Sequence, residues 1–393
     1  MRNLLHVSPY IHASAGGPPV VVERWAEFAG ACGWRASVLS TPAFADDGGE
    51  SLLHAARDRY ELQLVPSARH ALFGSGRAMV LGKIRDADIV HLHTMWSPLN
   101  AVVALACRQM NKPYVISPHG MLDPYSLGVK ALRKQLYLKL IEGRTISGAA
   151  SVLFTADEER DLAIEQVGNV PNPQVVGLGA DMPGTSPERL AEHFRTFHPD
   201  LADKQLLIFL GRLHPKKRPD AVIRAMTSIS ALAPDAILLV VGGGEPRYVD
   251  KLRSLAGGLG LSQRVRFLGP LTGDAKWGAL AASNLFVLPS LQENFAIAVA
   301  EALQVGIPVL ITTKINTWRE IVGAEAGLVL LDETLEADIA RHVVDLLSDP
   351  ETCRAMGSNG RALAQCAYTW PASAQKVCAV YDRVIARRGV ASG

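Results

Sequence analysis

Two glutamates, Glu293 and Glu301, are separated by seven residues where an apolar strand pattern gives way to a helical one. The first N–H groups of a helix lack partners within it and bind phosphate readily, so we expect the amides of Asn294, Phe295 and Ala296 to form such a site. Helical side chains tilt toward the helix N-terminus, so the Glu301 carboxylate should reach the same place. A carboxylate there suits paired sugar hydroxyls.

The alternative for this glutamate pair is structural. Glu293 would cap the helix and Glu301 would be a solvated surface residue. The helix around Glu301 is otherwise apolar, which favours a functional role over a solvated one; its apolar neighbours are Ala298, Val299, Ala302 and Leu303.

A dense cationic turn follows the apolar run at residues 207–210 and begins at Gly211. Arg212 can make forked contacts with a phosphate, and Lys217 can add a mobile point charge, which together suit a diphosphate leaving group. The side chains of a charge run are usually exposed to solvent, and we expect Lys216 and Arg218 to be exposed in this way. The position of Arg212 directly after the strand favours function there.

Histidine and glycine follow two further strand patterns. Pro118 and Gly120 flank His119 and predict an irregular turn that presents the imidazole to a ligand. Gly17 precedes a helical pattern, and its missing side chain would let the backbone approach a ligand closely.

Short apolar runs alternate with helical patterns along the whole chain, which predicts α/β architecture with parallel, doubly wound sheets. The predicted strands are residues 3–7, 35–39, 89–93, 114–117 and 151–154 in the first half, and 205–210, 236–241, 265–268, 285–288 and 308–311 in the second. In such sheets ligands bind beyond the carboxyl ends of the strands, where all the candidate residues fall.

The alternation of strand and helix patterns stops between residues 168 and 187, where the sequence is rich in Gly and Pro. We therefore predict one domain over residues 1–182, on the acceptor side, and a nucleotide-sugar-binding domain over 183–369. Residues 370–393 should form a final helix that packs back on the first domain.

Composition limits the possible functions. The chain has 393 residues, 48% of them hydrophobic, and a net charge of +2, too balanced for a nucleic-acid binder that relies on a basic surface. Five cysteines without a Cys-x-x-Cys pair, no leader and no apolar run of membrane-spanning length indicate a cytoplasmic protein. His91 and His93 share one side of a strand, but without a third ligand we expect no metal.

Together these motifs resemble the retaining glycosyltransferases of the GT4 family, which have the GT-B fold of two Rossmann-like domains facing a cleft. The resemblance covers nearly the whole chain, and most of its specificity lies in the Glu293-x7-Glu301 segment. One departure is that Lys217 is followed by Arg218-Pro, where the family has Gly.

The resemblance implies a metal-independent hexosyltransferase that needs no cofactor beyond a nucleotide-diphosphate sugar. Arg212 and Lys217 would hold the diphosphate, together with Gly17 and the amides of residues 294–296. Glu301 would bind the ribose, and Gly269 and Pro270 the base. His119 and Glu293 would act on the donor sugar.

The expected acceptor is a glycan or lipid-linked sugar, as in cell-surface polysaccharide synthesis. Residues 127–146 carry five cations against Glu142, which predicts an amphipathic basic helix on the inner face of an anionic membrane. A domain helix with a solvated basic face explains the same pattern.

Two other functions remain open at this point. A GT-B-fold nucleotide-sugar 2-epimerase would convert the donor without any acceptor, and the Glu-x7-Glu spacing argues against it. A non-catalytic sugar-nucleotide-binding subunit would bind the donor without turnover.

Overall fold

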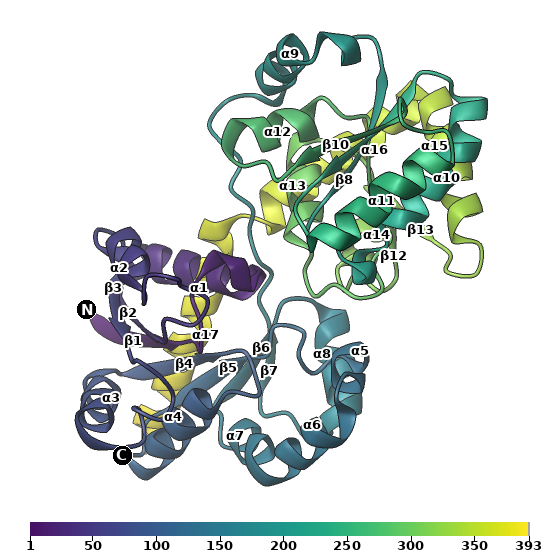
Figure 1. The fold of residues 1–393 in the computed structure, drawn as a ribbon. Helices are drawn as coiled ribbons and strands as arrows, with labels where there is room; N and C mark the ends of the chain where they lie inside the picture. The colour runs from purple at the N-terminus through teal and green to yellow at the C-terminus, as the bar shows by residue number, and fades with distance from the viewer. Residues whose placement is uncertain (392–393) are drawn as a thin grey trace. The chain divides into compact units, whose positions relative to one another are not determined.

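A computed structural model describes residues 1–391 of the chain, which form two compact units (Figure 1). The N-terminal unit comprises Met1–Leu178 and the C-terminal helix α17 (Trp370–Ala391), and the C-terminal unit comprises Gly179–Thr369. The division falls after Leu178, whereas the sequence analysis placed it after residue 182.

The N-terminal unit is built on a seven-stranded sheet of order β3-β2-β1-β4-β5-β6-β7, with every neighbouring pair parallel. Its strands are β1 (Arg2–Val7), β2 (Trp34–Ser40), β3 (Glu61–Leu64), β4 (Ile89–His93), β5 (Tyr114–Ser117), β6 (Ser151–Phe154) and β7 (Pro173–Val175). The strand order reverses between β1 and β4, the position where open α/β sheets bind ligands.

Helices connect these strands and cover the sheet. They are α1 (Gly17–Phe28), α2 (Glu50–Ala56), α3 (Gly74–Asp86), α4 (Pro98–Gln109), α5 (Pro124–Gly128), α6 (Ala131–Tyr137), α7 (Gly143–Ser147) and α8 (Asp157–Val167). Helix α17 packs against α1, and the Trp25 indole N–H of α1 donates to the Ser373 hydroxyl at 2.9 Å. The last segment of the chain thereby completes the core that the first segment begins.

The C-terminal unit has a six-stranded parallel sheet of order β10-β9-β8-β11-β12-β13. Its strands are β8 (Gln205–Leu210), β9 (Ala236–Val241), β10 (Val265–Gly269), β11 (Leu285–Leu288), β12 (Val309–Thr312) and β13 (Gly327–Leu330). Its helices are α9 (Pro187–Phe197), α10 (Pro219–Leu232), α11 (Pro246–Gly258), α12 (Gly273–Ala281), α13 (Ile297–Val305), α14 (Trp318–Gly323), α15 (Leu335–Ser348) and α16 (Pro350–Ala367). The predicted fold class, two doubly wound parallel-sheet domains, is confirmed.

The prediction of one amphipathic helix over residues 127–146 is wrong. A break at the extended Val129 and the left-handed Lys130, with φ 57°, separates α5 from a continuous helical run over Ala131–Ser147, which consists of α6, a π-helix (Leu138–Glu142) and α7. Glu142 turns into the core, so it does not belong to a polar face.

Candidate functional site

The carboxyl ends of β8, β9 and β10 converge on three glycines. Gly242 N–H donates to the Gly269 carbonyl at 2.8 Å, and a Cβ on Gly242 would lie 1.9 Å from the Gly211 carbonyl oxygen. Gly242 also has φ 139°, so both its conformation and its surroundings require glycine. Pro270, beside Gly269, is exposed at this edge, where the sequence analysis placed a base-binding contact.

Lys217 and Glu293, predicted to act on the same donor, do come together. The Lys217 Nζ lies 2.8 Å from Glu293 Oε1, and both side chains are largely buried. The Glu293 backbone is fixed on both sides, since its N–H donates to the Lys314 carbonyl and its carbonyl accepts from Asn316 N–H, at 2.9 and 3.1 Å. Lys217 and Glu293 therefore form an ion pair in a fixed position, in the turns that follow β8 and β11.

Arg212 supplies positive charge beside this pair. It is exposed and has no ion-pair partner among residues 1–391, so its guanidinium is available to an anion. Burial and then the positive charges of Arg212, Lys216 and Lys217 lower the pKa of His214. The whole turn therefore disfavours additional positive charge and suits a phosphate.

Glu301 is buried in α13 and pairs with Lys276 of α12 at 2.6 Å. Burial raises the pKa of Glu301, whereas the Lys276 ammonium opposes that rise. The alternative of a solvated Glu301 is therefore excluded. Sequence reasoning missed Lys276, because a partner 25 positions away leaves no local pattern.

The expected amide site at Asn294, Phe295 and Ala296 is corrected in one respect. Helix α13 begins at Ile297, so these three residues lie in the turn before the helix and do not form its first turn. Ala296 is the N-cap residue of α13 and is left-handed, with φ 59° and ψ 70°, and Phe295 before it is buried.

In the N-terminal unit, His119 lies directly beyond β5 in a strained turn. Its φ is 52°, uncommon for a residue other than glycine. The buried Glu159 holds this turn, since one carboxylate oxygen accepts from Gly120 N–H at 2.7 Å and the other from Thr155 N–H at 2.6 Å. Burial lowers the pKa of His119 to about 4, so its imidazole is neutral at pH 7.

The loop after the neighbouring strand β4 carries further strain. Thr94 and Trp96 have φ values of 67° and 62°. Asn100 donates to the Thr94 carbonyl at 3.1 Å, and the Glu142 carboxylate accepts from Trp96 N–H at 2.7 Å. Backbone strain persists where the surroundings fix it, often at functional sites, and these residues were missed because no local motif marks them.

Gly17 begins α1 just beyond β1 and is exposed. Nothing in the described protein lies within 4 Å of a Cβ built on it, and its φ is not positive. The fold therefore does not require glycine at residue 17, whereas Gly16, with φ 102°, must be glycine for its backbone.

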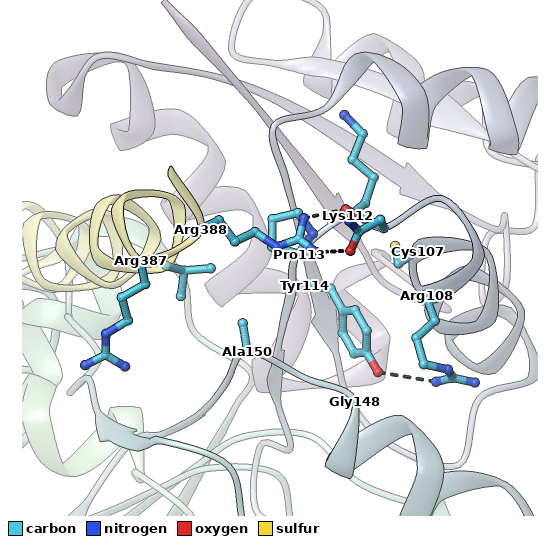
Figure 2. Close-up of a pocket in the computed structure, with 11 residues that line it drawn as sticks. Cys107, Arg108, Lys112, Pro113, Tyr114, Gly148, Ala150, Arg387 and Arg388 are labelled. Carbon is cyan, nitrogen blue, oxygen red and sulfur yellow. Dashed lines mark hydrogen bonds between the residues drawn. The ribbon is translucent and has the colours of Figure 1, made fainter. Parts of the chain in front are cut away.

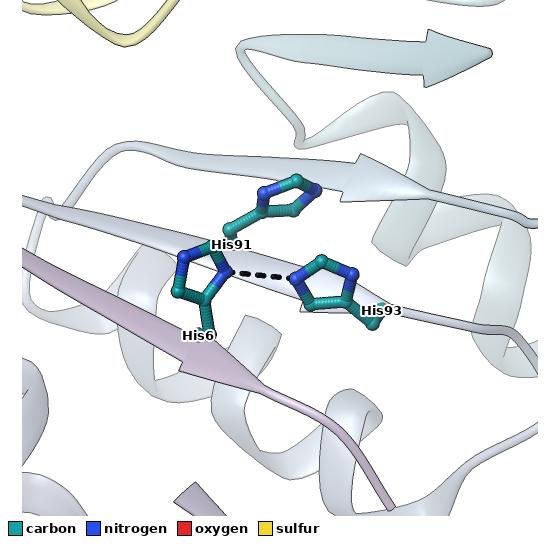
Figure 3. Close-up of side chains that lie close together, drawn as sticks. All are labelled: His6, His91 and His93. Atoms are coloured by element: carbon teal, nitrogen blue, oxygen red, sulfur yellow. Dashed lines mark hydrogen bonds between the residues drawn. The ribbon is translucent and has the colours of Figure 1, made fainter. Parts of the chain in front are cut away.

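The expectation that His91 and His93 lack a third neighbour is wrong. Strand β1 places His6 opposite His91, and the three buried imidazoles have nitrogens within 4.8 Å of one another (Figure 3). His6 was not predicted, because the strand pairing that brings it beside His91 leaves no mark in its local sequence pattern.

A cation-lined pocket of about 400 Å³ lies at the opposite, amino-terminal edge of the same sheet (Figure 2). Tyr114, the first residue of β5, lines it together with Arg108, Lys112, Arg387 and Arg388. Arg108 donates to the Tyr114 hydroxyl at 3.3 Å. This pocket is separate from the strand ends that carry the candidate residues.

Two family models match the chain. A glycosyl transferase 4-like domain matches residues 16–179, and the model described as glycosyl transferases group 1 matches residues 192–363. They fall on the two units and include the candidate residues His119, Arg212, Glu293 and Glu301.

Curated relatives share part of this sequence. A GDP-mannose-dependent monoacylated α-(1-6)-phosphatidylinositol monomannoside mannosyltransferase of Corynebacterium glutamicum is 35% identical over 41% of this chain and 42% of its own length. A D-inositol 3-phosphate glycosyltransferase of Salinispora tropica is 30% identical over 76% of this chain and 64% of its own. The chain thus spans less than half of the first relative and just under two thirds of the second.

Solved structures share the fold over almost the full chain. Anabaena HepE in complex with UDP has a TM-score of 0.80 at 20% identity, covering 98% of this chain and 100% of that one. WaaG, a glycosyltransferase involved in lipopolysaccharide biosynthesis, has a TM-score of 0.66 at 20% identity, covering 96% and 99%.

Proposed function

The chain belongs to the group 1 glycosyltransferases and has their GT-B fold, and from this premise we propose that it is a retaining hexosyltransferase. It moves a sugar from a nucleoside diphosphate sugar to a glycan or lipid-linked acceptor. The observation that carries the proposal is the Lys217–Glu293 ion pair beside the free guanidinium of Arg212.

The donor diphosphate is assigned to Arg212 and Lys217. Departure of the nucleoside diphosphate builds negative charge on its phosphate oxygens, and fixed cations at that position stabilise it. Lys217 already neutralises Glu293 at 2.8 Å, so the carboxylate can stand close to the diphosphate without repelling it. Two cations in place support a reaction that is independent of metal.

The remaining contacts of the donor follow the same assignment. The buried Glu301 carboxylate, held by Lys276, binds the ribose hydroxyls, and Gly269 with Pro270 contacts the base. Amides of residues 294–296 add phosphate contacts from the turn before α13. By the family resemblance, His119 and Gly17 act on the donor sugar and its phosphates.

A panel of nucleotide sugars, with an extract of lipid acceptors, tests the activity. We expect release of nucleoside diphosphate that persists in EDTA. Arg212→Ala should reduce kcat/KM about 10- to 100-fold, the loss of a charge-assisted contact, and Glu293→Gln should reduce kcat.

Lys216→Ala, in the same turn, is the matched control and should leave both constants nearly unchanged. Unaltered turnover in Arg212→Ala and Glu293→Gln would contradict the site. Conversion of donor without acceptor would identify an epimerase, and donor binding without any turnover would identify a binding subunit.

Lipid-linked acceptors place the enzyme at a membrane surface, which we propose to be the anionic inner face, in cell-surface polysaccharide synthesis. Within residues 1–391, none of the helices combines the length and the apolar character that a membrane span requires. Although 127–146 is not one helix, it exposes large apolar side chains beside cations such as Lys130 and Arg133; these are Leu132, Leu136 and Leu140, at 83%, 60% and 57% exposure. Apolar side chains interleaved with cations favour an interfacial contact.

Flotation with vesicles tests this contact. The chain should float with vesicles that contain anionic lipid and remain behind with neutral ones. Leu132→Ser with Leu136→Ser, or charge reversal of Lys130 and Arg133, should abolish flotation. Leu232→Ser, which changes an exposed leucine of the C-terminal unit, is the control. Flotation unaffected by the first changes would refute the membrane contact.

A further inference from the structure

Two buried imidazoles and the partly buried His119 form a hydrogen-bonded chain that ends at His119. His6 Nδ1 lies 2.9 Å from His93 Nε2, and His93 Nδ1 lies 3.1 Å from His119 Nε2. We call His6, His93 and His119 the histidine chain; Figure 3 shows its first link. His91 lies beside it but bonds elsewhere, to the Tyr381 and Ser117 hydroxyls.

Neutral imidazoles carry one proton each, so the histidine chain has only two consistent proton arrangements. Burial lowers the pKa of His6 to about 3 and that of His119 to about 4, and it holds the pKa of His93 well below 6.5. In the first arrangement all three carry the proton on Nδ1, and each link points toward His119. In the second all three carry it on Nε2, and each link points toward His6.

The His6 end of the histidine chain distinguishes the two proton arrangements. His6 Nε2 is buried and has no hydrogen-bond partner within residues 1–391. The second arrangement would put a proton there and leave a buried N–H without an acceptor, a rare defect in folded proteins. The first leaves only an unshared lone pair.

We propose that the histidine chain holds His119 in its Nδ1–H tautomer, so that His119 presents a hydrogen-bond donor to the substrate. His6 and His93 are then positioning residues. His119 Nδ1 has no hydrogen-bond partner in the described part of the chain, so its N–H is free for a ligand. The use of this donor on the sugar rests on the proposed function; the tautomer itself does not.

A metal ion would use the same nitrogens, but the ring geometry disfavours it. An imidazole binds a metal in its own ring plane, and the rings of His91 and His93 are stacked, with centroids 4.0 Å apart and planes 27° apart. Both His91 nitrogens already lie at hydroxyls, 2.6 and 2.9 Å away. A metal ion on His91 and His93 would break at least one hydrogen bond of the histidine chain and one of the two His91 hydrogen bonds.

Long-range ¹H–¹⁵N spectra of the full chain, recorded without substrate, test the proposal. They separate protonated from unprotonated ring nitrogens. We expect Nδ1–H on His6, His93 and His119, with ¹⁵N–¹⁵N coupling across both hydrogen bonds. Nε2–H on His119, or a metal ion bound to His6 or His93 in the purified protein, would overturn the proposal.

Two nearly isosteric variants at residue 93 test the link to His119. The amide of His93→Asn can still donate to His119 Nε2, so Nδ1–H should persist and kcat/KM should stay within about threefold. The carboxylate of His93→Asp can only accept, so at pH 9 the proton should move to His119 Nε2 and kcat/KM should fall about tenfold or more. An unchanged tautomer in His93→Asp would overturn the proposal.

His91→Phe is the control for general damage to this core. It keeps an aromatic ring in the same layer and should destabilise the unit without moving the His119 proton. A shift of the proton in this variant would contradict the assignment to the histidine chain. Absence of transferase activity in a protein with the expected tautomers would refute the proposed function alone.

Discussion

At the residue scale, Glu142 lies in the core although its sequence neighbours predict an exposed basic helix. It is 1% exposed, and it accepts from Trp96 N–H in the strained loop after β4. Burial raises its pKa to about 7, against the smaller opposing effect of its backbone hydrogen bonds. The folded protein therefore binds a proton at Glu142 that the unfolded chain releases at a lower pH.

Glu142→Gln should remove this proton uptake while keeping an acceptor for Trp96. A raised folded pKa means that stability is lost as pH rises, here between about 4.5 and 7. Wild type and variant should be equally stable near pH 4.5, and the variant more stable by about 3 kcal/mol at pH 8. Urea unfolding at both pH values measures the difference, and an equal difference at both would contradict it.

Residues that belong to a local sequence motif could be predicted, whereas residues that act through contacts made in the folded protein could not. Lys217 and Glu293 could be predicted because each follows a strand end, and parallel strands bring their carboxyl ends to one edge. Lys276, Glu159 and His6 could not, because each acts through a partner supplied by packing or strand pairing.

At the element scale, glycines allow the carboxyl ends of β8, β9 and β10 to approach one another at the edge of the sheet where the donor is proposed to bind. Gly242 sits where the end of β9 touches the end of β8, and its neighbour Gly243 has only Pro270 Cγ near a built Cβ, at 4.0 Å. The two adjacent glycines thus differ in steric demand although they look alike in sequence.

Gly242→Ala should therefore destabilise the C-terminal unit strongly, by about 3 kcal/mol or more, because its Cβ meets backbone at an unfavourable φ. Gly243→Ala should change stability by less than about 1 kcal/mol. Thermal unfolding of both variants measures this. Equal effects would show that the strand ends can separate without loss.

All the central strands were predicted, whereas of the four edge strands only β10 was. β8 and β9 are almost fully buried and are marked by continuous apolar runs. β3, β7 and β13 are short and only partly buried, and β7 includes Pro173 in the stretch predicted to be irregular. Edge strands are defined by a neighbour on one side, which their own sequence does not encode.

At the scale of the whole molecule, the two units differ in what they bury. His6, His91, His93 and His119 all belong to the N-terminal unit, and burial lowers the pKa of each. Helix α17 closes this core, because Tyr381 is fully buried against His91. Burial also lowers the pKa of His214 and His342 in the C-terminal unit, but neither side chain is fully buried, so the acid sensitivity of the chain should reside mainly in the N-terminal unit.

Calorimetry as a function of pH should separate the units. A lowered folded pKa means that stability is lost as pH falls, here below the unfolded value of 6.5. At pH 5.5 each of the four histidines costs about 1.4 kcal/mol relative to pH 7.5, and protonation of Glu142 returns about 2 kcal/mol, a net loss of about 4 kcal/mol. The melting temperature of the N-terminal unit should drop by about 10 °C.

Between pH 7.5 and pH 5.5 the melting temperature of the C-terminal unit should change less than that of the N-terminal unit. A single calorimetric unfolding transition should therefore separate into two. His91→Phe removes one titrating group and should reduce the acid shift by about a third, since it removes about 1.4 of the net loss of about 4 kcal/mol. Glu142→Gln should increase the shift, because it removes the opposing proton uptake. A parallel decline of both transitions would mean that the acid sensitivity does not originate in the buried histidines.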